Sequence, residues 1–320
     1  MILRNNAPYI HTELNAPYIY TNMMAALLPC ALYAIFCYGI RAVILLAMSS
    51  ILSLVAARVC DRLRGVAAAE YYDISAMVNG VVYALLLPPG VSLIVAACGV
   101  VLGELVIKQL FGGVGGNPVN TAAASALMMN LLCLNMDYCY IAPYSDRFGI
   151  DGLFTLRGSG IAADDTEGLY IAEILTGSYA GRMGTACCLM ILIGIIFLVF
   201  KRIVRIEAPI AYIVTIIAGY TILQKLNLFK VEGLRELVVF MVSSGVLFVA
   251  AFMITDCTTV AQGLSGGIIS GCFAGITTVI LGQFTSDMVF ICVPVLLTNY
   301  LVYTLEYLIS SMRSRRKVRL

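Results

Sequence analysis

Residues 108–120 read Lys-Gln-Leu-Phe-Gly-Gly-Val-Gly-Gly-Asn-Pro-Val-Asn, a glycine-rich stretch in a chain that is otherwise almost continuously apolar. Glycine and proline interrupt a membrane-embedded helix and leave backbone NH and CO groups without partners, which lipid cannot supply. We therefore expect this stretch to be a working site or a tight packing joint, sheltered by protein or lining a polar cavity. A phosphate-binding P-loop would end in Gly-Lys-Ser/Thr and follow a strand, and neither condition is met.

The composition is that of a polytopic membrane protein. Hydrophobic residues make up 61% of the 320 residues and charged residues 12%, with a mean hydropathy of +0.95, whereas a soluble chain is about 25% charged. A hydrocarbon core of about 30 Å takes roughly 20 helical residues. The sequence therefore predicts an all-α fold of about ten transmembrane helices. The apolar segments lie at about 21–38, 41–60, 76–87, 91–108, 119–136, 184–200, 208–223, 236–254, 264–282 and 288–309.

The charges predict an orientation and exclude two classes of site. With ten crossings and both termini inside, 13 of the 20 basic residues fall on the inner side and 7 on the outer side, as the positive-inside rule requires. The basic residues form no broad patch, so we expect no nucleic-acid partner. The eleven cysteines lack ligand spacing and His11 is the only histidine, so we expect no metal site.

The segment count divides the chain into two halves. A cytoplasmic N-terminal segment (1–20) precedes the first five-helix half (21–136), an extracytoplasmic loop (137–183) follows, and the second five-helix half (184–310) leads to a basic cytoplasmic tail (311–320). An odd number of helices per half makes the halves enter the membrane in opposite senses. The prediction is therefore an inverted repeat, in which sites often lie at the repeat interface on broken helices.

Two carboxylates are candidates for ion coupling. Asp73 precedes the short third segment, and Asp256 ends a long apolar helix among three hydroxyl side chains. A carboxylate within the membrane is by default a functional hypothesis, and the alternative is a helix-end residue at the membrane surface. Carboxylate oxygens suit Na⁺ and can also relay H⁺. Lys108 is expected to snorkel to the interface, with Glu104 one turn earlier as a pairing partner.

Several stretches resemble one family of membrane proteins. Ala7-Pro8-Tyr9-Ile10 resembles its Ser-Pro-His/Tyr start, and residues 108–120 are similar to its Lys-Gln-Leu-Phe-Gly-Gly-Leu-Gly-Gln-Asn-Pro-Phe-Asn block. Thr255-Asp256 is similar to its Thr-Asp-Pro. From end to end the chain resembles the RnfD component of the Rnf ion-translocating electron-transport complex and, more distantly, the NqrB component of the sodium-pumping NADH:quinone reductase.

The resemblance implies a setting and partners. It implies a multi-pass subunit in a bacterial-type inner (plasma) membrane, surrounded by the lipid bilayer and by other Rnf-like subunits. The distribution of basic residues predicts that both termini are cytoplasmic. Such a complex passes electrons between ferredoxin and NAD and couples them to Na⁺ or H⁺ movement. The alternative of a different class is a flavin-free scaffold or small-molecule transporter on the same fold.

The resemblance also implies a flavin, either FMN or riboflavin. Glycine permits close backbone approach to a ring system or to a neighbouring helix, and asparagines can bond to the polar edge of a ring, although helix packing with asparagine caps is the alternative. The candidate flavin-binding residues are Gly112, Gly113, Gly115, Gly116, Asn117 and Asn120.

The resemblance does not by itself imply that FMN is attached covalently to this chain. In the family, FMN is esterified to the threonine of a Ser-x-Ala-Thr motif in the loop between the halves. Here Gly149-Ile150-Asp151-Gly152 matches the entry to that motif, but Arg157 stands at the acceptor position. Thr155, two positions earlier, is the nearest candidate acceptor. The acidic stretch Asp164-Asp165-Thr166-Glu167 would also repel a flavin phosphate.

Overall fold

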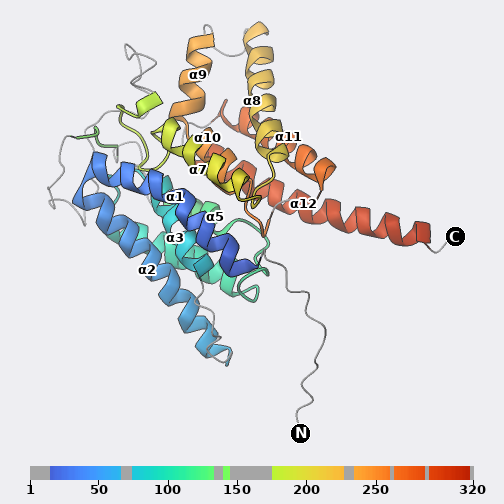
Figure 1. Ribbon diagram of the computed structural model, residues 1–320, viewed down its shortest axis with the longest axis horizontal. Helices are drawn as coiled ribbons and strands as arrows, with labels where there is room; N and C mark the ends of the chain where they lie inside the picture. The colour runs from blue at the N-terminus through green and yellow to red at the C-terminus, as the bar shows by residue number, and fades with distance from the viewer. Residues whose placement is uncertain are drawn as a thin grey trace.

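The computed structural model is built of helices, and no strand occurs in any of the ranges it describes (Figure 1). It describes residues 15–65, 74–132, 140–144, 175–226, 234–259, 263–284 and 288–317. The candidate residues Asp73 and Thr155 lie outside these ranges. The described parts of the ten predicted apolar segments are largely helical, so the expected all-α class is confirmed.

The first half contains five helical segments in the predicted order. Its fourth segment begins as an α-helix and widens into a π-helix (η1) before the glycine-rich stretch, and π-helical turns are frequent at functional sites. The segments are α1 (Ala16–Tyr38), α2 (Ile40–Leu63), α3 (Ile74–Leu86), α4 (Leu93–Gly103) with η1 (Glu104–Gln109), and α5 (Thr121–Leu132).

The second half is also helical, but the segment expected at 236–254 is broken. It stops at Ser244 and Gly245, where Gly245 has a φ of +83°, and resumes as a short helix and a second π-helix. A glycine adopts this left-handed conformation without the steric cost that a Cβ would impose. The helices are α7 (Cys188–Phe200), α8 (Glu207–Lys225), α9 (Leu234–Ser243), α10 (Val246–Phe248), η3 (Val249–Met253), α11 (Leu264–Leu281) and α12 (Met288–Lys317).

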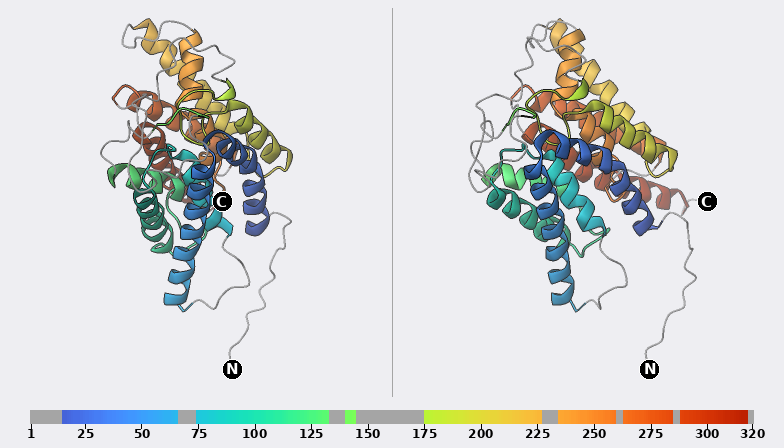
Figure 2. Two further views of the ribbon diagram at one scale, coloured as in Figure 1. Left: turned by 90° about the vertical axis from the view of Figure 1, so that its left-hand side faces the viewer. Right: turned by 60° about the vertical axis from the view of Figure 1, so that its left-hand side comes forward.

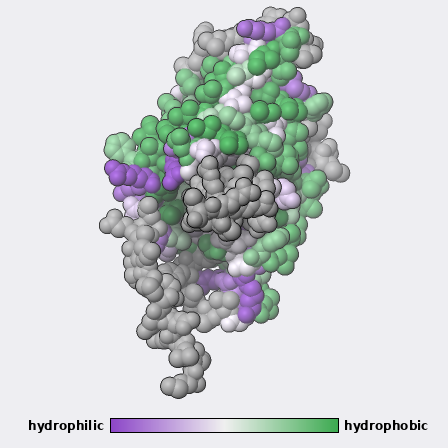
Figure 3. Space-filling model, turned by 90° about the vertical axis from the view of Figure 1, so that its right-hand side faces the viewer, coloured by the Kyte–Doolittle hydropathy of each residue, from purple (hydrophilic) through white to green (hydrophobic). Residues whose placement is uncertain are grey.

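Among the residues that the structure describes, four helices, α1, α2, α8 and α11, are long and apolar enough to cross a membrane. The helix α3 is short, as expected, and it ends before Pro88 because proline cannot continue a helix. Figure 3 shows one face of the molecule, on which hydrophobic residues predominate and hydrophilic ones form small patches. A surface of this kind suits contact with lipid.

Glycines let several helices pack at very short distance. A Cβ on Gly271 of α11 would lie 2.4 Å from the Ala208 carbonyl oxygen of α8, and one on Gly103 of α4 would lie 1.9 Å from Ser125 Oγ of α5. Close approach of this kind through small residues is typical of membrane helices. The α8–α11 and α4–α5 contacts therefore require glycine at these positions.

The two halves contact each other through helices at matching places in their order. The first helix of one half, α1, packs against the first of the other, α7, and α5 packs against α12. The views in Figure 2 show the second-half helices α7 to α12 lying over the first-half bundle.

Before α7 lies a stretch of buried non-helical backbone that the sequence did not reveal. Residues 179–187 are buried, and their backbone pairs with the end of α3, where Met183 N donates to Leu87 O (3.1 Å) and Gly184 N to Leu85 O (2.8 Å). The buried Arg182 side chain donates to Ser244 O at the break after α9 (2.8 Å). Non-helical backbone is thus sheltered here, as the membrane environment requires.

Candidate functional site

A buried polar cluster lies where η1, the start of α5 and the connection after η3 meet. We call Glu104, Lys108, Asn120 and Asp256 the carboxylate cluster. The Asn120 side-chain amide donates to Asp256 Oδ2 across 3.1 Å and joins the first half to the second. Sequence reasoning placed these two residues in different roles, and the structure brings them into direct contact.

Asp256 lies in the connection between η3 and α11 and is 7% exposed. Its Oδ1 accepts hydrogen bonds from the backbone NH (3.2 Å) and the hydroxyl (3.1 Å) of Thr258. Burial raises the pKa of the Asp256 carboxyl above its usual value, against the opposing effects of Thr258, the Lys108 charge and Asn120. The Asp256 carboxylate is therefore enclosed by the protein and not exposed on the surface of the chain.

Glu104 and Lys108 form a buried ion pair within η1. Lys108 Nζ lies 3.1 Å from Glu104 Oε1 and donates to Ser75 Oγ at 2.7 Å. The side chains of Lys108 and Glu104 are 2% and 1% exposed, respectively. The expected pairing is thus confirmed, whereas the expected snorkelling of Lys108 is wrong because its ammonium group points into the protein.

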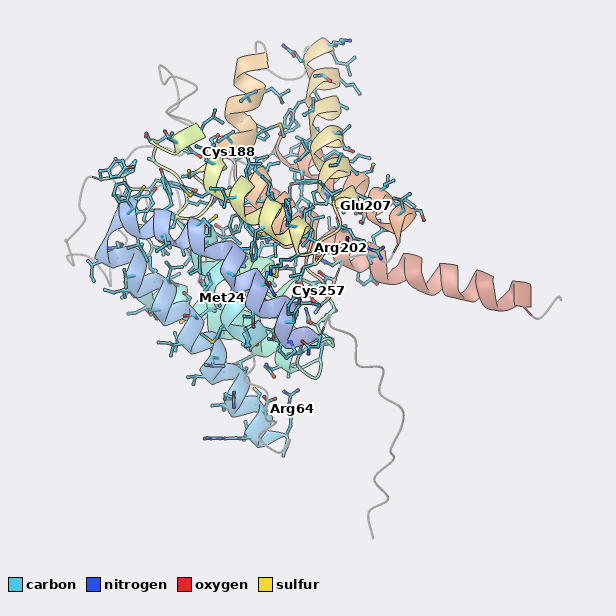
Figure 4. All side chains as sticks on the ribbon, in the orientation of Figure 1. Met24, Arg64, Cys188, Arg202, Glu207 and Cys257 are labelled. Carbon is cyan, nitrogen blue, oxygen red and sulfur yellow. The ribbon has the colours of Figure 1, made fainter. Side chains whose placement is uncertain are left out.

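Further hydrogen bonds hold Glu104 in place. Ser53 Oγ donates to Glu104 Oε2 (3.1 Å) and Gln109 Nε2 donates to Glu104 Oε1 (3.1 Å). Arg64, labelled in Figure 4 at the end of α2, donates to Gln109 Oε1 (2.6 Å) and pairs with Asp61 at 2.6 Å. A continuous series of polar contacts therefore runs from partly exposed Arg64 to buried Glu104.

The glycine-rich stretch turns sharply after η1. Gly112, Gly113 and Gly115 have φ values of +105°, +94° and +83°, which only glycine adopts readily. Gly112, Gly115 and Gly116 are exposed, and no atom lies within 4 Å of a Cβ built on Gly112 or Gly115. Within the described residues, neither Gly112 nor Gly115 is packed tightly against another part of the protein. Glycine is required at both positions by the backbone conformation.

The two asparagines attach this stretch to the Asp256 turn. Asn117 Nδ2 donates to Thr258 Oγ (3.2 Å) and also lies 3.3 Å from Val119 O. Asn120 caps the N-terminus of α5, because its Oδ1 accepts a hydrogen bond from Ala123 N (3.0 Å). The asparagine-cap interpretation is thus confirmed for Asn120, whose Oδ1 and Nδ2 both have partners inside the protein.

Three buried side-chain oxygens near the carboxylate cluster lack a hydrogen-bond partner in the described part of the chain. They are Thr121 Oγ, Thr259 Oγ and Asn299 Oδ1. Asn299 on α12 donates from its other side-chain atom to Thr259 O (3.3 Å), so it faces the connection that carries Asp256. Sequence reasoning missed Asn299, which follows a largely apolar stretch at the start of α12. An amide in such a helix was the available signal.

No group of three or more His, Cys, Asp or Glu residues suited to a metal ion occurs among the residues the structure describes. What the cluster offers is oxygen atoms and one ammonium group. Oxygen ligands suit hard cations such as Na⁺ or a proton, whereas thiolates and imidazoles suit transition metals.

Comparison with known proteins supplies the family. Residues 3–314 match the family described as NQR2, RnfD, RnfE. The chain is similar to the D component of the Na⁺-translocating ferredoxin:NAD⁺ oxidoreductase complex of Acetobacterium woodii, at 29% identity over 278 residues, covering 87% of this chain and 84% of the relative. It is also similar to the D component of the ion-translocating oxidoreductase complex of Salmonella typhimurium, at 24% identity over 338 residues, covering 94% and 95%. The chain is therefore a polytopic membrane protein that belongs to the NQR2, RnfD, RnfE family.

Proposed function

We propose that this chain is the membrane subunit of an Rnf-like complex that couples electron transfer between ferredoxin and NAD to movement of Na⁺ or H⁺. Family membership and the names of the relatives support the setting. The observation that carries the coupling role is the buried Asn120–Asp256 contact beside the Glu104–Lys108 pair. This contact joins the start of α5 in the first half to the connection after η3 in the second half.

Charge balance explains why the carboxylate cluster would take up a cation. Glu104 and Asp256 carry two negative charges when ionised, and Lys108 supplies one positive charge. A net negative charge in a buried site is unfavourable unless it is compensated. One monovalent cation, either Na⁺ or H⁺, restores neutrality at Asp256. The unpartnered oxygens of Thr259 and Asn299 are available to coordinate it.

The arrangement of helices supports the inverted repeat. Contacts between α1 and α7 and between α5 and α12 pair helices of equal rank in the two halves. Each half contains a π-helix followed by a non-helical connection, η1 before the glycine-rich stretch and η3 before Asp256. Two broken helices that converge on one polar site are the arrangement of ion-coupled membrane proteins with inverted repeats.

The glycine-rich stretch fits a non-covalently held flavin. Gly112 and Gly115 leave open space around their backbone, and Gly113 and Gly116 continue the same turn. Arg64 guanidinium lies 3.5 Å from the Cβ position of Gly113 and would supply positive charge beside a flavin that gains negative charge on reduction. When bound, FMN or riboflavin would supply the redox chemistry. Asn117 remains a candidate hydrogen-bonding residue, while the Asn120 side chain is already engaged by Asp256 and Ala123.

Native purification tests the electron-transfer role against the flavin-free scaffold or transporter. The tagged chain, purified in mild detergent, is expected to bring Rnf-like subunits with it and to release flavin on acid precipitation. A fluorescent band on a denaturing gel that disappears in Thr155→Ala would instead show covalent FMN at Thr155. Purification without flavin, without partners and without ferredoxin-dependent NAD⁺ reduction would favour the transporter.

A further inference from the structure

The short turn between α7 and α8 carries exposed positive charge. Lys201, Arg202 and Arg205 are all exposed, and none of them forms an ion pair with another described residue. Glu207, at the start of α8, is the only acidic residue of the stretch, which leaves a net charge of +2 over residues 201–207. Figure 4 labels Arg202 and Glu207 at this join.

An apolar groove of about 530 Å³ runs along α7 up to this turn. It is lined by Ile193, Ile196, Phe197, Phe200 and Lys201. The ammonium group of Lys201 lies 5.8 Å from the centre of the Phe197 ring, so the positive charge closes one end of the groove. The groove thus has a long hydrocarbon wall and a cationic end.

The backbone at the turn adds an independent observation. Arg202 N donates to Val199 O (2.9 Å) and Ile203 N donates to Leu198 O (3.1 Å), the two hydrogen bonds that define a Schellman helix end. Arg202 occupies its left-handed position with a φ of +56°. Glycine is the usual residue there because a side chain is unfavourable in that conformation. Such outliers concentrate at functional sites.

We propose that this turn and groove bind one molecule of an anionic phospholipid. The phosphate group lies against Lys201 and Arg202, and an acyl chain follows Ile193, Ile196 and Phe200. Juxtamembrane basic residues attract anionic headgroups, and long basic side chains reach the headgroup region from an apolar wall. An arginine in place of glycine at the helix end adds a second exposed positive charge beside Lys201 at this turn. This site is independent of the redox role.

Native mass spectrometry of the full-length chain with its copurifying subunits tests the site. Phosphatidylglycerol and phosphatidylcholine are titrated separately in the same detergent. The wild type is expected to bind phosphatidylglycerol more tightly. Arg202→Gly lowers that affinity about fivefold and Lys201→Gln with Arg202→Gly about 25-fold, since each basic residue near an anionic surface contributes about fivefold. Binding of phosphatidylcholine stays unchanged.

Three controls separate a specific site from general effects. Arg202→Gly relieves the left-handed strain, so its thermal midpoint should not fall. Lys225→Gln removes an exposed charge at the end of α8 and should keep the wild-type preference. Ile196→Trp, which fills the groove, should weaken both lipids. Equal wild-type affinity for the two lipids, an unchanged preference in the double variant, an equal loss in Lys225→Gln, or displacement by millimolar inorganic phosphate would overturn the proposal.

Discussion

Replacing Lys108 by methionine removes one charge of a buried ion pair and keeps an unbranched side chain of nearly the same length. Glu104 is then left without its ammonium partner in a site where it is 1% exposed. Removing one partner of a buried pair destabilises a protein by about 3–5 kcal/mol, because the remaining charge has lost its compensation. We expect the thermal midpoint to fall by about 6–10 °C, at about 2 °C for each kcal/mol.

The chain carries its own probes for this measurement. Cys30, Cys37 and Cys292 are buried, so a thiol-reactive dye that fluoresces on coupling reports unfolding in detergent. Glu104→Gln combined with Lys108→Met should regain much of the lost stability, with a coupling energy of about 1–3 kcal/mol between the two positions. Lys225→Met, at an exposed lysine, is the matched control. The buried pair would be refuted if Lys108→Met lowered the thermal midpoint by less than about 1 °C. It would also be refuted if the effects of the two substitutions were additive in the double variant.

Two further predictions concern packing and the cap of α5. Gly271→Ala places a Cβ 2.4 Å from the Ala208 carbonyl oxygen and should cost about 1–3 kcal/mol by overpacking, measured as a fall in thermal midpoint. Gly267→Ala on the same helix meets no atom closer than 3.7 Å and should be tolerated; equal losses in both variants would contradict the close α8–α11 contact. Asn120→Ala removes a buried cap and the contact between the halves and should cost about 1–2 kcal/mol. Asn117→Ala should cost less, and the reverse order would be inconsistent with the site as described.

The sequence alone located the helices because their signal is local. Apolar segments of sufficient length, punctuated by Pro88 and by the glycines after Lys108, determine where helices begin and end. The break at Gly245 was not foreseen, since Ser244-Gly245 lies in a long apolar segment without proline. A single glycine within such a segment is compatible with an unbroken helix.

The site was predicted in parts, and its assembly could not be. Asp256 and the glycine-rich stretch were singled out because polar or irregular residues stand out in an apolar chain. The contact between Asn120 and Asp256 spans 136 positions of sequence, which no local pattern encodes. The sequence alone predicts Lys108 at the membrane interface, the usual place for a lysine in an apolar chain. Its burial depends on the contacts of its ammonium group with Ser75 and Glu104, which exist only in the folded molecule.

Ion transport by the reconstituted complex tests the central claim most directly. The ratio of radioactive Na⁺ or of H⁺ taken up per NADH formed is measured in proteoliposomes for the wild type, for Asp256→Asn and for Asp61→Asn, a partly exposed carboxylate at the end of α2. Coupling at the carboxylate cluster predicts that Asp256→Asn abolishes most of this ion uptake per NADH in an assembled complex, while Asp61→Asn keeps the wild-type ratio. A wild-type ratio in Asp256→Asn would contradict the proposed role of the cluster.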